Sequence, residues 1–304
     1  MCVLGFAIVA LISISFGPLT SVSAQAPPPV SQPLWTAEIP GLTVDQPGKG
    51  DVPELLVTKV KSENPTAAVV ILPGGGYRGL AMPHEGYQIA EWFHSIGVTS
   101  AICTYRVRGA GNDGKGYGHP YPMMDAQRAI QTVRANAKKW NVDPKRVGVI
   151  GFSAGGHLCS TVSTKFITAE PESADPIQRV SSRPDFSILC YPVIAFDKPY
   201  THKGSQVNLL GADASPAMIQ LMSNEEQVSA QTPPTFLFHT AEDKVVPVEN
   251  SVQYYLSCMR HGVPAELHAF PAGRHGVGLA TNLPGAGQWP KLCEAWLKDL
   301  GVID

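Results

Sequence analysis

Gly151-Phe152-Ser153-Ala154-Gly155-Gly156 is the stretch of sequence that decides the fold. An apolar run, Val147 to Ile150, comes directly before it, and His157 to Val162 can continue after it as a helix. A strand, a tight turn and a helix form the context in which G-x-S-x-G predicts a nucleophile elbow. Glycines on both sides of Ser153 favour this interpretation, because strand and helix approach closely at such a turn. The alternative is a glycine- and serine-rich turn without chemistry.

The residues that would activate Ser153 come later in the chain. A serine hydroxyl needs a histidine to take its proton and an acid to hold that histidine in the right tautomer. In a nucleophile-elbow fold the order along the chain is serine, acid, histidine. We predict Asp243 as the acid, because its spacing to the next Val-Pro pair matches the D-x-x-V-P turn usual in such enzymes; Glu242 is the competing candidate. His275 follows the last predicted strand on a glycine-flanked loop, and it is the predicted base.

Backbone N–H groups near Ser153 are predicted to bind the oxyanion of a tetrahedral intermediate. Ala154 directly follows the nucleophile and supplies one donor. Gly75 and Gly76 follow an early predicted strand, where the second donor is expected, and Tyr77 beside them is predicted to contact substrate. A phosphate loop is the alternative, but such a loop ends in G-K-[ST]. No G-x-G-x-x-G in the sequence follows a first strand and has an acid about 20 residues further on, and there is no CxxC or paired Cys/His spacing, so we predict no cofactor and no metal.

Strands and helices are predicted to alternate along the chain. Continuous apolar runs such as Ala67 to Leu72 indicate strands that are covered on both faces. This alternation predicts an α/β fold, with a mostly parallel sheet and helices on both faces. The predicted strands are 55–57, 67–72, 98–105, 147–150, 186–191, 235–238 and 265–270, the further predicted helices are 87–96, 124–140, 249–261 and 288–300, and the stretches 167–183 and 195–231 are expected to be irregular and to shape a pocket.

Eight motifs along the chain carry a family resemblance. They are Leu72-Pro73-Gly74-Gly75-Gly76-Tyr77, His119-Pro120, Asp143-Pro144-Lys145-Arg146, Gly151 to His157, Arg183-Pro184-Asp185-Phe186, Tyr191-Pro192-Val193-Ile194, His239 to Pro247 and His275-Gly276. On these motifs the chain resembles α/β-hydrolases of the esterase/lipase group, and among them acetylxylan-esterase-like and feruloyl-esterase-like carbohydrate esterases. The resemblance covers about residue 34 to the C-terminus. It departs at Pro73, where related lipases carry the histidine of HGGG, and at Arg274 and Val277, where Gly and Phe are expected.

The resemblance implies a serine esterase that works through an acyl-enzyme on short-chain carboxylic esters. Its expected substrate is a small ester or an acetylated carbohydrate, xylan first. A feruloyl esterase and a general short-chain carboxylesterase or lipase are the nearest alternatives. A peptidase of the prolyl-oligopeptidase kind shares the elbow, but it carries a large propeller domain that we do not expect here. A non-catalytic binding protein on the same scaffold is a further alternative.

The N-terminus predicts a secreted or periplasmic protein. Cys2 to Phe16 is apolar and uncharged, and this run is shorter than the about 20 residues of a spanning helix. Small residues at Val22-Ser23-Ala24 suit cleavage, so we predict a signal peptide at 1–24. A linker and irregular segment at 25–50 and an α/β-hydrolase catalytic domain at 51–304 follow. A retained membrane anchor is the alternative, because no Lys or Arg precedes the apolar run.

The distribution of charge limits the classes of partner that we expect. The net charge of -2 and the lack of any block of like charge give no footprint for nucleic acid, so none is expected as a partner. No stable membrane insertion is expected after signal cleavage, and nothing in the sequence indicates an oligomeric state.

An odd number of cysteines would remain in the mature chain, so not all can pair within it. Cys103 and Cys190 lie in apolar runs and are predicted to be buried free thiols.

Overall fold

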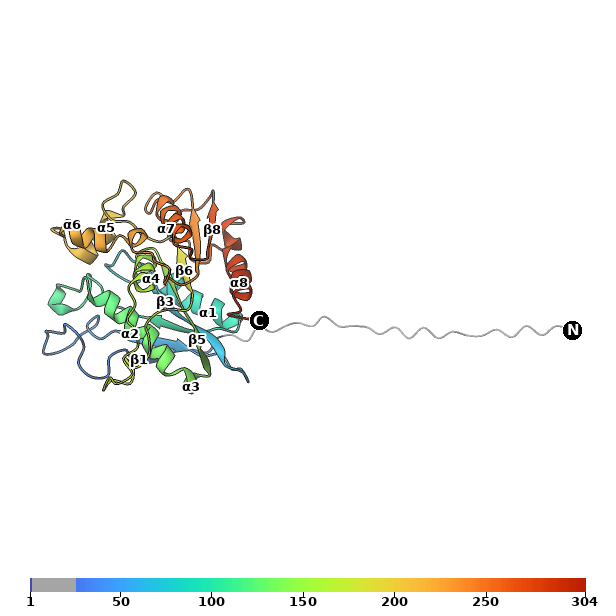
Figure 1. Cartoon of the computed structure of the whole chain (residues 1–304), viewed down its shortest axis with the longest axis horizontal. Helices are drawn as coiled ribbons and strands as arrows, with labels where there is room; N and C mark the ends of the chain where they lie inside the picture. Colours follow the sequence, from blue (N-terminus) through green and yellow to red (C-terminus); the bar gives the residue numbers. More distant parts are fainter. Residues whose placement is uncertain (2–25) are drawn as a thin grey trace.

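Eight strands form one sheet in the computed structural model, which describes Met1 and residues 26–304 (Figure 1). The order across the sheet is β1-β2-β4-β3-β5-β6-β7-β8. β2 pairs antiparallel with β1 and β4, and all pairs from β4 to β8 are parallel, which confirms the predicted mostly parallel sheet. The strands are β1 Val30–Pro33, β2 Glu54–Thr58, β3 Thr66–Leu72, β4 Thr99–Cys103, β5 Val142–Phe152, β6 Ser187–Cys190, β7 Thr235–Thr240 and β8 Ala265–Phe270.

Helices cover both faces of this sheet. One apolar cluster joins the sheet to α2, α4 and α7, and a second cluster joins the opposite face to α1 and α8. Within β3, Val70 and Leu72 belong to the first cluster, whereas Val69 and Ile71 belong to the second. This double burial explains why the strands are continuously apolar in sequence. The helices are α1 Gln88–Ser95, α2 Tyr121–Ala135, α3 Ala137–Trp140, α4 Ala154–Thr164, α5 Lys203–Leu210, α6 Pro216–Leu221, α7 Glu249–Arg260 and α8 Trp289–Asp299, with short turns η1 Pro83–Tyr87, η2 Asn112–Gly114, η3 Asn224–Glu226 and η4 Ala286–Gln288.

The predicted strands and helices are found, with boundaries shifted by a few residues. The one exception in kind is the helix predicted over 124–140, which the structure divides into α2 and α3. The break falls at Asn136, whose ψ of 9° is not helical. Sequence periodicity continues across this break because Ala137 and Trp140 are buried like the apolar residues of α2.

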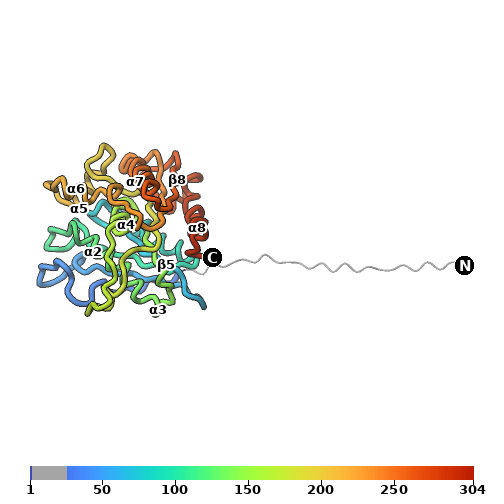
Figure 2. The backbone as a smooth tube through the Cα atoms, in the orientation of Figure 1, coloured from blue at the N-terminus to red at the C-terminus, as the bar shows by residue number. Residues whose placement is uncertain are grey.

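Two segments that we predicted to be irregular contain regular structure. Residues Val30–Pro33 form the edge strand β1, so the prediction of a linker and irregular segment over 25–50 was wrong there. The stretch 195–231 contains α5 and α6, shown in gold on the side of the molecule away from α8 (Figure 2). Sequence periodicity missed α5 because its buried face includes Ser205 and Gln206 beside Leu209. The stretch 167–183 contains no helix or strand, as predicted.

The predicted signal peptide falls almost entirely on residues that the structure does not describe, so it stays a prediction. In the described part of the chain, every helix is too short or too polar to span a bilayer. The five cysteines found there are all buried and carry free thiols, which confirms the expectation for Cys103 and Cys190.

Candidate active site

Ser153 lies on the tight turn between β5 and α4. Its φ of 53° is in the left-handed region that residues other than glycine rarely adopt. The Ser153 N–H donates to the carbonyl of Cys190 at 3.0 Å, which ties the turn to the end of β6. A Cβ on Gly155 would lie 2.1 Å from the carbonyl oxygen of Leu72, so only glycine allows α4 to approach β3 this closely. The elbow predicted from G-x-S-x-G is therefore present.

Three predicted side chains meet at the carboxyl edge of the sheet. His275 Nε2 lies 2.8 Å from Ser153 Oγ. His275 Nδ1 lies 2.5 Å from Asp243 Oδ2, and the Asp243 side chain is fully buried. The three residues follow β5, β7 and β8, and the ends of parallel strands meet at one edge of a sheet. The structure thus forms the hydrogen-bonded chain that the sequence predicts, while the catalytic roles stay a prediction.

Asp243 is held as an ionised carboxylate. Its Oδ1 accepts the backbone N–H groups of Val245 and Val246, each at 2.9 Å. Burial alone would raise the pKa of this carboxyl, but contacts with His239, His275 and the N–H of Val246 together hold the pKa below its usual range. Glu242 is exposed, and its carboxylate accepts the N–H of Gly273 at 3.1 Å. The geometry therefore favours Asp243 over Glu242 as the partner of His275.

The glycine turn after β3, formed by Gly74, Gly75 and Gly76, lies against Ser153. A Cβ on Gly74 would be 2.9 Å from Ser153 Cβ. The carbonyl of Gly75 accepts the N–H groups of Arg78 and Gly79, and the carbonyl of Gly76 accepts Asn208 Nδ2 at 2.8 Å. The N–H groups of Gly75, Gly76 and Ala154 have no hydrogen-bond acceptor among the described residues. Three donors thus remain available at the turn, as an oxyanion site requires.

The side chain of Tyr77, which we predicted to contact substrate, faces the core of the protein. Its side chain is buried, with 1% exposed, and its hydroxyl donates to His157 Nδ1 at 2.8 Å. His157 Nε2 in turn donates to the carbonyl of Met222, and burial lowers the pKa of this imidazole to about 3. With a φ of 57°, Tyr77 directs its ring beneath the glycine turn into the core. Sequence alone did not distinguish an inward from an outward ring at this position.

His202 is a residue near the site that our prediction missed. It precedes α5, and its ring Cε1 lies 3.9 Å from where a Cβ of Gly76 would be. Its Nδ1 is 2.8 Å from Ser205 Oγ. Burial lowers the pKa of His202, and the nearby His275 lowers it further. The only sequence signal was its place in the stretch 195–231, which we expected to shape the pocket.

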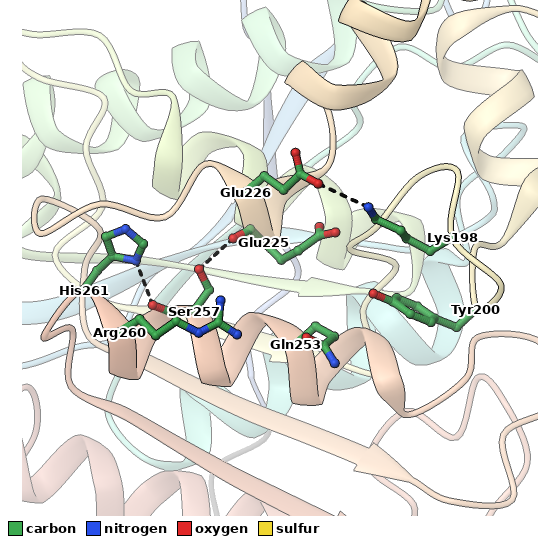
Figure 3. Close-up of a pocket in the computed structure, with 8 residues that line it drawn as sticks. All are labelled: Lys198, Tyr200, Glu225, Glu226, Gln253, Ser257, Arg260 and His261. Carbon is green, nitrogen blue, oxygen red and sulfur yellow. Dashed lines mark hydrogen bonds and ion pairs between the residues drawn. The ribbon is translucent and has the colours of Figure 1, made fainter.

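A hollow lies along α7, and its lining includes none of Ser153, Asp243 and His275 (Figure 3). Its volume is about 460 Å³, and an ion pair between Lys198 and Glu226 at 3.3 Å crosses its rim. Ser257 donates to the carbonyl of Glu225, whose side chain extends toward Tyr200 (Figure 3). None of the predicted site residues is among its lining residues, which are Lys198, Tyr200, Glu225, Glu226, Gln253, Ser257, Arg260 and His261. Within residues 26–304, no group of His, Cys, Asp and Glu is arranged to hold a metal ion.

Comparison with known proteins identifies the family. The sequence model of the BD-FAE family matches residues 55–257. An acetylxylan esterase of Xylanibacter ruminicola is 36% identical over 244 residues, which are 79% of this chain and 45% of that protein. Endo-1,4-beta-xylanase B of Butyrivibrio fibrisolvens is 35% identical over 236 residues, 77% of this chain and 36% of that protein. The chain thus spans less than half the length of these relatives.

Solved structures share the fold. The acetyl ester-xyloside bifunctional hydrolase from Caldicellulosiruptor lactoaceticus superposes with a TM-score of 0.86 at 43% identity, covering 93% of this chain and 100% of that one. Carboxylesterase Cest-2923 from Lactobacillus plantarum has a TM-score of 0.69 at 24% identity, covering 91% and 98%. The predicted α/β-hydrolase fold is therefore confirmed.

Proposed function

The chain belongs to the BD-FAE family, and we propose that it is a secreted serine esterase that removes short acyl groups, acetyl groups on xylan or a related carbohydrate first. One observation carries the proposal: the hydrogen-bonded chain from Ser153 through His275 to Asp243 ends beside free N–H donors. The names of the relatives, an acetylxylan esterase and an acetyl ester-xyloside hydrolase, support acetyl esters as the first substrate class to test.

The first chemical step is attack of Ser153 on the ester carbonyl. Asp243 accepts the Nδ1–H of His275, which leaves the Nε2 lone pair facing the serine hydroxyl. Nε2 takes the hydroxyl proton as Oγ forms a bond to the carbonyl carbon. The carbonyl electron pair moves to oxygen, and the N–H groups of Ala154 and the glycine turn stabilise that negative charge.

The second step releases the alcohol and frees the enzyme. The tetrahedral intermediate collapses, the bond to the alcohol oxygen breaks, and His275 gives its proton to that oxygen. Water then loses a proton to His275 and attacks the acyl group on Ser153 through a second tetrahedral intermediate. Release of the carboxylic acid restores the hydroxyl of Ser153.

The rim of the site is polar, which suits a carbohydrate alcohol. His202 lies beside Gly76, and His84 Nε2 lies 4.0 Å from where a Cβ of Gly276 would be. These two imidazoles lie near the turn and near the loop of His275, where they can exchange hydrogen bonds with sugar hydroxyls. α5 is fixed against the turn, because Asn208 donates to Gly76 and accepts Arg108 Nε through its carbonyl.

A substrate panel tests the acyl and alcohol groups. We expect acetate release from acetylated xylan, and among aryl esters of two to twelve carbons we expect turnover to fall as the chain lengthens. The measurement is acetate release from the polymer beside kcat/KM for each aryl ester, with a feruloylated ester included. No acetate from xylan, with turnover rising with chain length, would contradict the proposal and favour a lipase-like role.

The same panel with His202→Ala tests the polar rim. We expect KM for acetylated xylo-oligosaccharides to rise about 10-fold, because one or two hydrogen bonds to the sugar are lost, while KM for p-nitrophenyl acetate stays within about 2-fold. His261→Ala, at the end of α7, is the matched control, because His261 lines the hollow along α7. An equal loss on both substrates would remove His202 from sugar recognition.

Secretion is the remaining part of the proposal. It is supported by the apolar run Cys2 to Phe16 and the small residues before Gln25 in the sequence. The full chain is expressed in a bacterial host, and the N-terminus of the recovered protein is sequenced. We expect a chain that begins at Gln25 and is found outside the cytoplasm. Recovery from the membrane fraction with residues 2–24 intact would support the retained anchor instead.

A further inference from the structure

Glu85 is a buried carboxylate that the mechanism above does not use. It lies in η1, before α1, and only 2% of it is exposed. Both carboxylate oxygens accept hydrogen bonds: Oε2 from the N–H of Gly74 at 2.8 Å, and Oε1 from the hydroxyl of Tyr191 at 2.9 Å. The half-exposed imidazole of His84 is also close, with its Nε2 3.6 Å from Glu85 Oε1. A carboxylate is costly to bury, so its retention beside the site needs an explanation.

One of its two contacts fixes the glycine turn. Gly74 donates its N–H to Glu85, and its carbonyl accepts the N–H of Ala81 at 2.8 Å. Both polar groups of Gly74 are therefore held by the segment that carries Glu85. A Cβ on Gly74 would lie 2.6 Å from Glu85 Oε2 and 2.9 Å from Ser153 Cβ, so the carboxylate lies directly behind the turn at the nucleophile. Gly75 and Gly76, the predicted oxyanion donors, follow at once in the chain.

The other contact reaches the loop of the base. The hydroxyl of Tyr191 donates to Glu85 and accepts the N–H of Gly278 at 2.9 Å. The Tyr191 ring packs edge-on against His275, with ring centroids 5.2 Å apart. The carbonyl of Gly278 accepts Trp289 Nε1 at 3.0 Å, which fixes the same loop to α8. Glu85 is thus connected to both sides of Ser153.

We propose that Glu85 is a positioning residue: its carboxylate holds the glycine turn through Gly74 and the histidine loop through Tyr191, so that the oxyanion donors and His275 keep a fixed separation across Ser153. The proposal rests on the proposed serine-esterase function. Reaction rate depends steeply on this separation, because a misplacement of about 1 Å can cost about 100-fold. Glu85 acts through backbone groups and touches no reacting atom.

The protonation state of Glu85 gives this role a distinct signature. Burial raises the pKa of Glu85, and the contacts with Tyr191, His84, Gly74 and His275 offset this only in part. Tyr105 and Cys190 also face it, and burial raises the pKa of each, so they stay neutral. A raised pKa means that the ionised form is less favourable in the folded than in the unfolded chain. Its neutral form contributes stability at low pH, and that contribution is lost as the pH rises through the folded pKa.

The test compares Glu85→Gln with wild type and with Glu91→Gln, an exposed glutamate on α1 that serves as a matched control. Active sites are first titrated with an organophosphonate, and kcat and KM for p-nitrophenyl acetate are then measured per active site. We expect Glu85→Gln to lower kcat about 10- to 100-fold, less than the loss of a direct oxyanion donor, with KM within about 3-fold. Its unfolding midpoint at about pH 7 should not fall below that of wild type.

Two further readouts separate positioning from a merely structural role. The deficit of Glu85→Gln should narrow as the pH falls, because protonated wild-type Glu85 also loses an acceptor. Tyr191→Phe should lower kcat by a similar factor, and the double variant should be no worse than Glu85→Gln, because both act through one network. Wild-type kcat in Glu85→Gln, a deficit equal at every pH, or additive losses would overturn the inference. If Glu85→Gln does not fold, unchanged kcat in Tyr191→Phe overturns it. An inactive wild type would instead refute the proposed esterase.

Discussion

Ser153→Ala should abolish nearly all ester hydrolysis, with kcat falling about 10⁶-fold, as for the nucleophile of comparable triads. The reason is that Ser153 supplies the one hydroxyl bonded to His275 Nε2 within residues 26–304, so without it no acyl-enzyme forms. A residual rate of about 10³- to 10⁴-fold over water should persist, from the oxyanion site and binding alone. The measurement is kcat for p-nitrophenyl acetate, with loss of labelling by a fluorophosphonate.

The fold should survive this substitution. Ala removes one oxygen from a residue whose strained φ is fixed by the surrounding turn. Ser95→Ala is the matched control, because Ser95 is an exposed serine at the end of α1. Unfolding midpoints of both variants should stay close to wild type. Substantial turnover in a pure, folded Ser153→Ala sample would show that the nucleophile lies elsewhere.

Asp243→Asn should cost about 10⁴-fold in kcat, the loss that follows when the acid of a serine triad becomes an amide. Asparagine cannot accept the Nδ1–H of His275 as a carboxylate does, and its amide favours the wrong tautomer of the imidazole. The loss is not offset by exposure to solvent, because the Asp243 side chain is fully buried. The measurement is kcat per active site beside wild type.

Glu242→Gln is the matched control for this prediction. Its carboxylate is exposed and accepts only a backbone N–H in the described structure, so kcat should change less than about 3-fold. Because the pKa of Asp243 is lowered in the fold, its carboxylate stabilises the folded chain above about pH 4 and loses that effect as the pH falls through the folded value. Melting curves must therefore accompany the kinetics. The reverse ranking of the two variants would move the acid to Glu242.

Local sequence signals were enough to find the three residues of the hydrogen-bonded chain. Ser153 stands in a glycine-flanked turn between an apolar run and a helix, and only small neighbours fit there. Asp243 and His275 each follow a predicted strand. Parallel strands end at one edge of a sheet, so residues that directly follow such strands are expected to lie close together. The parallel sheet itself followed from continuous apolar strands alternating with helices.

Tertiary packing decided which side chains face the site and which support it from behind. Tyr77 adjoins the glycine turn in sequence, yet it points inward, because His157 offers its hydroxyl a buried acceptor. His202 lies 49 residues after Ser153 and 41 residues before Asp243 in the chain, and the segment that leads into α5 brings it to Gly76. Glu85 meets Gly74 and Tyr191 only after the sheet has formed. Periodicity and motifs indicate the helix or strand to which a residue belongs. These contacts depend instead on how separate elements pack against one another, and no local stretch of the sequence shows that packing.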